Sequence, residues 1–509
     1  MELHHLWRAV SAEREAVVAQ LVGGTLLIVL LFFLFRRQPK LKLPPSPFPS
    51  LPLLGHVFHL DSICTTGTTP THRRLRDKLG PIFTLYVGNT PVIFITSAGL
   101  AHEALVGQSL LFAGRPPFPS RFTFTNNFRN INSATYGPYW RSLRRNLVQE
   151  MLTAPRVSAL KPMRNYVFDN LMSSIRTEAH DSHGVVSIFA QLRDAMFQLL
   201  VLMCFGFDMP KETLLELSIM SDDVLSFAGG ALTDFYGFLD VFDGKRREKV
   251  RTLRANQVKT YSAFIEKHKE LQKLGQLQVQ GSYLETLLNM DASSPLSTDD
   301  LVTLCSEFTT VGTDTTVTTL EWTMARLVEN PLVQQKLHQQ IYEVMGDKLV
   351  EEADLQQFPY LQAVVREALR LHPPGHLLLP HSTSKLCTVG GYDIPPNAIV
   401  MFPVMFMAKD PDIWNEPSKF KPERFLEMKV DITGSKDMSM MPFGAGRRIC
   451  PGLGLATMHM ELLVARLVQM FEWSVWPPAS GVDLSERAIF TVRMQNPLKA
   501  LARERIKAL

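Results

Sequence analysis

The sequence of 509 residues predicts a mainly α-helical fold with a small β portion, in a single large domain behind one N-terminal transmembrane helix. Apolar residues recur with the period of an α-helix over long stretches, whereas runs of β-branched and aromatic residues are short. An uncharged apolar run near the N-terminus has the length of a membrane span. Because we find no internal repeat and no second domain boundary, one large domain is favoured over two.

The composition excludes several classes of protein. Apolar residues make up 46% of the chain, which is too many for a disordered chain and enough for a sizeable core. The formal net charge is only +4, so no nucleic-acid partner is indicated. Without a CxxC pair, neither a disulfide framework nor a zinc cluster is predicted, and a reducing compartment fits the scattered cysteines. These are Cys64, Cys204, Cys305, Cys387 and Cys450.

Residues 16–35 carry no charge and are rich in Val, Leu and Phe, so they predict a transmembrane anchor. A cleavable signal peptide is the alternative, but basic residues follow the run where a small-residue cleavage site would stand. Those basic residues place the C-terminal side in the cytosol and residues 1–15 in the lumen. Residues 36–55, basic and then rich in proline, predict a stiff extended hinge before a catalytic domain at 56–509.

The remaining elements follow from local patterns. Two β-rich runs around a Gly-Asn turn predict a hairpin over residues 82–95. Polar and turn-forming residues predict a surface loop over 278–298. Long helices are predicted over Val186–Cys204, Arg246–Lys273 and Ser297–Asn330, and short β runs near Cys387–Tyr392, Phe490–Val492 and Leu498–Leu501.

A glycine-rich loop, Pro442–Gly452, carries Cys450 and leads into an apolar helix over about 453–471. The field of that helix and the nearby charge of Arg448 favour a thiolate, which makes Cys450 a candidate metal ligand. A lone loop cysteine is more often a packed small apolar residue, so the surrounding residues have to decide between the two interpretations.

The residues Phe443, Gly446, Arg448, Cys450 and Gly452 fill the pattern Phe-x-x-Gly-x-Arg-x-Cys-x-Gly, which resembles the haem loop of the cytochrome P-450 superfamily. The resemblance implies the P-450 fold and haem b, with Cys450 as the axial thiolate and metal ligand that favours O–O cleavage. It also implies that Phe443 shields the sulfur and that Arg448 pairs with a haem propionate.

Two further segments resemble cofactor-binding parts of this family. Trp140 and Arg144 resemble its propionate-binding helix, and His381 stands where many relatives place a propionate-binding arginine. Arg141 and Arg145 widen the helix into a basic face, although a solvated charged surface is the alternative for Arg141. The resemblance implies that an acidic, flavin-containing reductase docks on this face.

Gly312, Asp314 and Thr315 match the family's pattern in its long central helix. The resemblance implies that Thr315 hydrogen-bonds at the dioxygen site and that Asp314 relays protons from solvent. Val311 departs from the pattern, because relatives have a small residue there, and would narrow the space above the haem. A threonine-rich buried helix with a satisfied aspartate is the alternative interpretation.

Glu367, Arg370 and Arg424 resemble the family's buried Glu–Arg–Arg network, whose role would be to fix the loop that presents Cys450. The resemblance covers essentially the whole chain, in the order expected of a plant microsomal (A-type) enzyme. It therefore implies an endoplasmic reticulum protein with one membrane span and a catalytic domain facing the cytosol.

The expected function is an NADPH- and O2-dependent monooxygenase that hydroxylates or epoxidises a lipophilic substrate, with electrons from NADPH-cytochrome P-450 reductase. The chain resembles plant groups that include in-chain fatty-acid hydroxylases and epoxidases linked to cutin. The alternatives are oxygenation of a phenylpropanoid, terpenoid or other specialised metabolite, a haem-thiolate isomerase or dehydratase that needs no reductase, and a non-catalytic haem-binding membrane protein.

Substrate contacts are expected in mostly apolar segments, which suits a lipophilic substrate. Arg121 and Arg129 are candidate partners for a fatty-acid carboxylate, and a surface role is the alternative for each. The expected contact segments are Phe122–Asn132, the residues Phe308, Thr309 and Val311, and the segments Gly375–Leu379 and Phe490–Val492.

Overall fold

The computed structural model describes residues 23–25, 41–51, 54–59, 70–227, 232–290 and 295–505. The chain divides into two compact units, Met1–Leu43 and Pro44–Leu509, and almost all described residues belong to the second. The predicted lumenal segment and anchor at 1–35 lie outside the described residues, except that residues 23–25 are helical. Cys64 also lies outside them.

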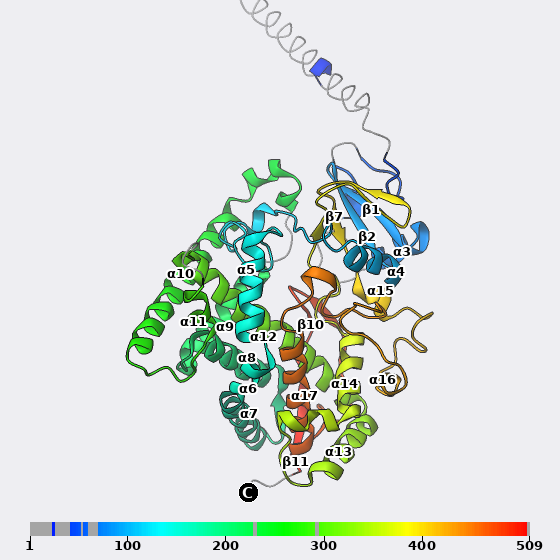
Figure 1. Ribbon diagram of the computed structural model, residues 1–509. Coiled ribbons are helices and arrows are strands. Elements are labelled where there is room, and N and C mark those ends of the chain that lie inside the picture. Colours follow the sequence, from blue (N-terminus) through cyan, green and yellow to red (C-terminus); the bar gives the residue numbers. More distant parts are fainter. Residues whose placement is uncertain are drawn as a thin grey trace, which may run out of the picture. The chain divides into compact units, whose positions relative to one another are not determined.

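Helices dominate the second unit, as predicted (Figure 1). The α-helices are α3 (Pro70–Leu79), α4 (Ala98–His102), α5 (Pro138–Asn146), α6 (Ala154–Ala159), α7 (Lys161–Asp181), α8 (Ile188–Phe205), α9 (Lys211–Ser226), α10 (Gly244–Lys273), α11 (Tyr283–Leu288), α12 (Thr298–Glu329), α13 (Pro331–Met345), α14 (Pro359–Leu371), α15 (Val404–Ala408), α16 (Arg424–Glu427) and α17 (Leu453–Met470). Short 3-10 or π segments lie at Val57–His59, Glu103–Gly107, Pro119–Arg121, Leu147–Met151, Leu232–Asp234, Gly237–Phe242, Glu352–Gln357 and Gly446–Arg448.

The strands form small sheets. They are β1 (Ile82–Val87), β2 (Thr90–Ile95), β3 (Val185–Ser187), β4 (His381–Ser382), β5 (Cys387–Val389), β6 (Tyr392–Ile394), β7 (Ile399–Met401), β8 (Phe471–Val475), β9 (Glu486–Ala488), β10 (Val492–Met494) and β11 (Lys499–Glu504). The sheet orders are β1-β2-β7-β4, β3-β11-β8, β5-β6 and β10-β9. β1 and β2 form the predicted antiparallel hairpin, which is thereby confirmed, while β2 and β7 pair in parallel.

The proline-rich segment packs on the second unit from Pro44 onward. The Pro45 carbonyl accepts a hydrogen bond from the Thr84 amide at 2.8 Å, and the Pro47 carbonyl lies 2.9 Å from Nε2 of His56. The described prolines of the segment predicted as a hinge over 36–55 are thus held against β1 and its neighbours.

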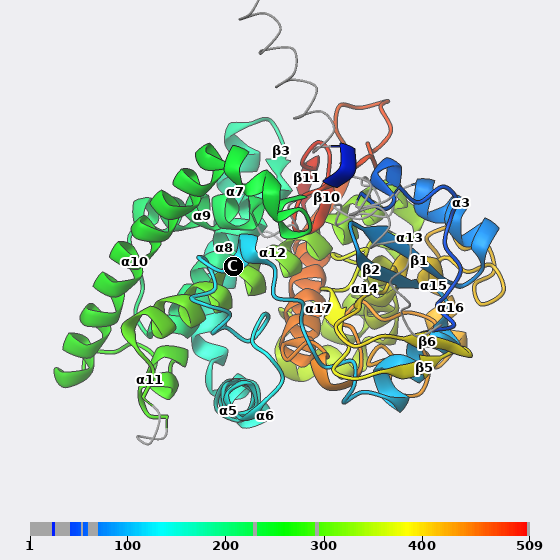
Figure 2. The ribbon, with the colours of Figure 1, turned by 90° about the horizontal axis from the view of Figure 1, so that it is seen from above.

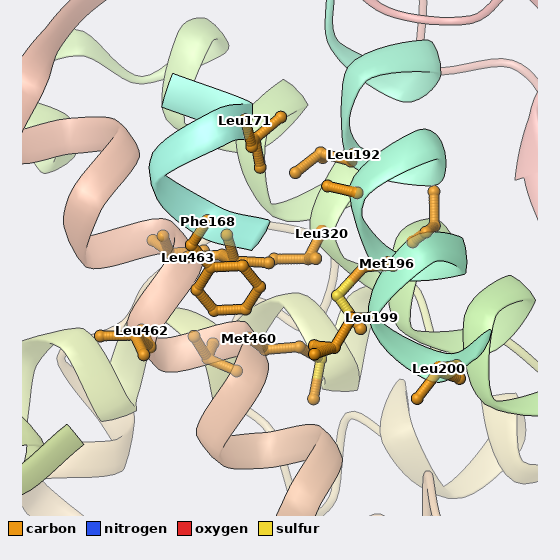
Figure 3. Packing of buried hydrophobic residues seen from close by; sticks show 14 of the residues in the cluster. Phe168, Leu171, Leu192, Met196, Leu199, Leu200, Leu320, Met460, Leu462 and Leu463 are labelled. Atoms are coloured by element: carbon orange, nitrogen blue, oxygen red, sulfur yellow. The ribbon is translucent and has the colours of Figure 1, made fainter. Parts of the chain in front are cut away.

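The long helix α12 forms the centre of this unit and contacts α8, α10, α14 and α17. Ser297 starts it with a capping box, since its hydroxyl accepts the Asp300 amide while the Asp300 carboxylate accepts the Ser297 amide. Seen from above, α12 and α17 lie between the side formed by α9–α11 and the side that carries β1, β2, β5 and β6 (Figure 2). Figure 3 shows Phe168, Met196, Leu320 and Leu463 meeting in the apolar core between α7, α8, α12 and α17.

Among the described residues, α8 is the helix that is long and apolar enough to span a membrane. Two-thirds of it, 67%, is buried inside the protein, where it packs against α7 and α12. Its apolar character is therefore explained by its place in the core.

The prediction of a surface loop over 278–298 was only partly right. It contains α11, which Ser282 caps through a hydrogen bond from the Glu285 amide to its hydroxyl. Tyr283, Leu284 and Leu287 are buried, so tertiary packing stabilises a helix that is too short to show a clear period in the sequence.

Candidate active site

A cavity of about 380 Å³ is lined by one face of α12, by the cysteine loop 442–452 and by the segment 374–381. α12 contributes residues about one turn apart, among them Glu307, Val311 and Thr315. Trp140, Arg144, His381, Phe443, Arg448 and Cys450, predicted to bind the cofactor, also line it. Of the predicted catalytic residues, Thr315 lines the cavity and Asp314 does not.

The cysteine loop has a backbone that only its glycines allow. The Cys450 amide donates to the Phe443 carbonyl at 2.9 Å, which closes the loop. Gly446 has a φ of +67°, and a Cβ on it would lie 1.9 Å from the Leu105 carbonyl oxygen. No other residue fits there, so the loop and with it the position of the thiol are fixed by close backbone contact.

Burial raises the pKa of the Cys450 thiol, although the Gly452 amide and Arg144 act in the opposite direction. The Gly452 amide and Arg144 favour the thiolate that the sequence predicts, and burial of the side chain opposes it. A metal ion that displaces the proton would supply the missing stabilisation.

The two predicted site residues of helix α5 bind two different segments, of which one is the cysteine loop. Trp140 donates from Nε1 to the Ile131 carbonyl at 2.9 Å, and Arg144 donates to the Ile449 carbonyl at 2.7 Å. The Arg448 guanidinium lies 4.5 Å from the centroid of the Trp140 ring. The three side chains therefore form one wall of the cavity beside Cys450.

Arg115 joins this wall as a cation that the sequence reasoning missed, because a single arginine before two prolines carries no periodic signal. It donates to the carbonyls of Asn132, Leu379 and Pro380, at 3.0, 2.8 and 2.9 Å. Burial, with the charges of Arg448 and Arg121, lowers the pKa of Arg115 to about 9. Within the described part of the chain no carboxylate pairs with Arg115 or Arg448, so this edge of the cavity suits an anion.

His381 differs from a propionate-binding arginine in charge. Its Nδ1 lies 2.7 Å from the Phe112 carbonyl, which can only accept, so Nδ1 carries the proton. Burial and the charge of Arg115 lower the pKa of His381 well below its ordinary value. The neutral ring then presents Nε2 as a hydrogen-bond acceptor. To pair with a carboxylate, the ring must first take up a second proton, which a nearby anion favours.

Asp314 points away from the cavity toward Arg493, with which it forms an ion pair. Arg493 also binds Asp222 at 3.1 Å, and the Asp222 side chain is 40% exposed. The Thr491 hydroxyl donates to Asp314 at 2.8 Å and lines the cavity. The structure therefore connects Asp314 to the cavity through Thr491, which the sequence placed only within a substrate-contact segment.

Glu307 is a second residue that the sequence reasoning missed, although it is a lone acid in an apolar stretch of α12. Its carboxylate accepts the amides of Ile131 and Asn132 at 2.9 and 2.8 Å. Burial raises the pKa of Glu307 to about 7, despite those amides and the charge of Arg448. Glu307 thus joins α12 to Ile131 and Asn132, which also line the cavity.

Two further predictions, the Glu–Arg–Arg network and the substrate contact of Thr309, have different outcomes. Glu367 binds Arg370 at 2.7 Å and Arg424 at 3.0 Å, which confirms the buried Glu–Arg–Arg network. Both arginines donate to carbonyls of the segment 408–419, so the network fixes that segment. Thr309, predicted to contact substrate, instead lies 3.0 Å from the Tyr261 hydroxyl, outside the cavity.

The family model for Cytochrome P450 matches residues 44–500. The chain belongs to the cytochrome P450 family. As a P450 it is a haem-thiolate monooxygenase that receives electrons from a redox partner. The partly buried thiol, the arginines at one edge of the cavity and the mostly apolar lining fit haem, whose propionates are anions on an apolar ring. Trp140, Arg144, Phe443, Arg448 and Cys450 all line this cavity.

Similar proteins come from plants. Cytochrome P450 89A9 of Arabidopsis thaliana is 37% identical over 90% of this P450 and 93% of its own length. Ent-cassadiene C11-alpha-hydroxylase 1 of Oryza sativa subsp. japonica is 34% identical, over 94% and 98%. An isoflavone 2'-hydroxylase of Glycyrrhiza echinata is 32% identical, over 96% and 98%. These relatives make this chain a plant P450.

Solved structures confirm the P450 fold. A zebra fish cytochrome P450 with progesterone has a TM-score of 0.74 and covers 86% of this chain and 100% of its own, at 24% identity. A structure titled as a zebra fish cytochrome P450 with abiraterone has a TM-score of 0.72 over the same shares.

Proposed function

We propose that this P450 takes electrons from NADPH through NADPH-cytochrome P450 reductase and inserts one oxygen atom of O2 into a C–H or C=C bond of a fatty acid. The observation that carries this proposal is the cavity itself, in which Cys450 and Thr315 line an otherwise mostly apolar space. Haem bound through a cysteine thiolate supplies the activation of O2.

The residues of the chain have distinct proposed roles. Cys450 is the metal ligand, and Phe443 lies beside it in the same loop. Arg144 and Arg448 attract the anionic edge of the cofactor, with Trp140 and His381 in the same wall. Thr315 offers its hydroxyl at the dioxygen site, and it now donates to the Val311 carbonyl at 3.0 Å. Asp314 accepts the hydrogen bond of the Thr491 hydroxyl, and through it serves proton delivery to the cavity.

The proposed location is the endoplasmic reticulum membrane, with a single span over 16–35 and the catalytic domain facing the cytosol. The uncharged run and the basic residues after it support this proposal. An isomerase or dehydratase is not favoured, since Thr315 and a basic face for a reductase would have no role in it.

The deciding experiment is the difference spectrum of the reduced, carbon monoxide-bound protein. We expect a Soret band at the long wavelength typical of thiolate ligation, its loss in Cys450→Ala, and its retention in Cys387→Ala. Cys387 is a suitable control because it is buried in β5, outside the cavity. An imidazole-type spectrum in the wild-type protein would contradict the assignment of Cys450.

A second measurement tests the substrate. The haem-loaded protein, reductase and NADPH are incubated with a C12–C18 fatty-acid set, and with isoflavones and diterpene hydrocarbons as the comparison set that the names of the relatives suggest. In-chain hydroxylated or epoxidised fatty acids are the expected products. Products from the comparison set alone would remove the fatty-acid proposal and leave the monooxygenase.

A further inference from the structure

The cations that line the cavity differ in what they bind. Arg115, Arg144 and Arg448 each donate to backbone carbonyls. Arg121, at the end of the 3-10 turn Pro119–Arg121, also lines the cavity. Its Nε is buried and has no hydrogen-bond partner in the described part of the chain. Its guanidinium lies over the Phe118 ring at 5.2 Å, which leaves its donors free.

Arg121 has no hydrogen bond to the acid that attracts it, Asp234, in the described part of the chain. Asp234 attracts it electrostatically, but the Asp234 carboxylate accepts the Ser120 amide and hydroxyl, each at 2.7 Å. A partly buried cation without a hydrogen-bonded counter-ion is costly unless an anion reaches it. In the described part of the chain, the Nε group of Arg121 is therefore a buried donor of the cavity wall that no protein acceptor uses.

Arg129, the other sequence candidate for a carboxylate partner, is already occupied. It binds the Asp300 carboxylate at 2.6 and 2.9 Å, and its side chain is 40% exposed. Since Asp300 also caps α12, this pair has a structural role at the start of that helix. The two arginines of one loop, which the sequence could not separate, thus have different environments.

The surroundings of Arg121 define the shape of a ligand. Phe118, Phe235, Ile399 and Met401 line the same cavity and are apolar. A ligand that matches them carries a long apolar body and one acidic group.

We propose that Arg121 binds the carboxylate of the substrate, so that this P450 selects acidic lipophiles over their neutral counterparts. The inference rests on the proposed monooxygenase function and adds the group by which the substrate is recognised. A haem propionate carries the same chemical group, so the test has to separate a substrate carboxylate from a cofactor carboxylate.

The experiment titrates dodecanoic acid and its methyl ester into the haem-loaded, full-length protein and follows the spin-state shift of the Soret band. The wild-type protein binds the acid more tightly than the ester. In Arg121→Gln the Kd of the acid rises by about tenfold or more, as expected for the loss of a charge-assisted hydrogen bond, and the Kd of the ester stays within about twofold. Arg121→Lys keeps part of the preference, because it keeps the charge.

Arg129→Gln is the matched control from the same loop. Any change that it causes through the α12 cap affects acid and ester equally, so the ratio of their Kd values is unchanged. Haem content and the carbon monoxide spectrum are recorded for every variant. A wild-type protein with an intact thiolate spectrum that binds the acid no better than the ester overturns the inference.

A different failure has a different meaning. If Arg121→Gln loses haem, and the Lys variant shows no preference for the acid, Arg121 serves a propionate and the inference is wrong. If the wild-type protein shows no thiolate spectrum, the proposed function itself fails before the question of the carboxylate arises.

Discussion

The hydroxyl group of Thr491 connects Asp314 of α12 to the cavity. Asp314 is buried and held by Arg493, so its carboxylate meets the cavity through the side chain of Thr491. Thr491 also lies 3.1 Å from the Thr318 hydroxyl, which fixes its rotamer between two partners. The hydroxyl of this β-branched residue is thus the polar group that lies between Asp314 and the cavity, and in the proposed function protons pass through it.

Replacing Thr491 by Val keeps the shape and removes the hydroxyl. We expect haem binding to be retained, and the yield of product per NADPH to fall by about tenfold or more, a smaller loss than the roughly 10²- to 10⁴-fold that general acid catalysis contributes in full. The measurement is the ratio of hydroxylated dodecanoic acid to NADPH oxidised, with hydrogen peroxide quantified in parallel. Thr491→Ser is the control, and equal losses in both variants would show that packing rather than the hydroxyl matters.

At the scale of elements, two carboxylates of α12, Asp300 and Glu307, bind the segment before α5. Glu307 accepts two consecutive backbone amides, Ile131 and Asn132, and lines the cavity at the same time. Its pKa of about 7 means that the folded protein holds a proton there that the unfolded chain releases above pH 4.5. Its contribution to stability is therefore complete below pH 4.5 and is lost as the pH rises through 7.

Glu307→Gln removes this titration. The difference in free energy of unfolding between wild type and variant should shrink as the pH rises from 5 to 8, by at most about 3 kcal/mol for a pKa that moves from 4.5 to about 7. Thermal unfolding of the holoenzyme at a fixed scan rate measures it. Glu266→Gln, exposed on α10, is the control and should show a difference that does not vary with pH. A constant difference for Glu307→Gln would contradict the raised pKa.

The sequence predicted the elements better than the directions of their side chains. Long helices, the hairpin of β1 and β2 and the cysteine loop follow from periodicity and turn residues, which are local properties. Whether Asp314 or Thr315 faces the cavity depends on the rotation of α12 against β10, and the role of Arg115 depends on three carbonyls distant in sequence. α11 was missed for the same reason, since its stability comes from burial rather than from its own six residues.

At the scale of the whole molecule, cations are exposed near the cysteine loop. Arg141 and Arg145 on α5 and Arg447 in the loop are exposed. Arg141 and Arg447 both lie against Tyr136, with ring distances of 5.8 and 5.6 Å. This group, Arg141, Arg145 and Arg447, is the basic face on which we expect an acidic reductase to dock.

Reversing one of these charges should weaken that docking. We expect Arg145→Glu to raise the KM for the reductase by about three- to tenfold at low salt, with a smaller effect at high salt because ions screen exposed charges. Steady-state NADPH oxidation against reductase concentration at two ionic strengths measures this. Arg503→Glu, exposed on β11, should behave as the wild type, and identical behaviour of both variants would place the docking surface elsewhere.

The backbone of Ile131 and Asn132 is hydrogen-bonded to an acid through its amides and to side-chain donors through its carbonyls. Their amides bind the Glu307 carboxylate, while their carbonyls accept from Trp140, Arg448 and Arg115 at 2.9, 3.1 and 3.0 Å. A peptide unit cannot rotate without breaking the bonds on both sides at once. We therefore expect local unfolding of this segment to break these bonds together, and the two amides to exchange their hydrogens slowly and at similar rates.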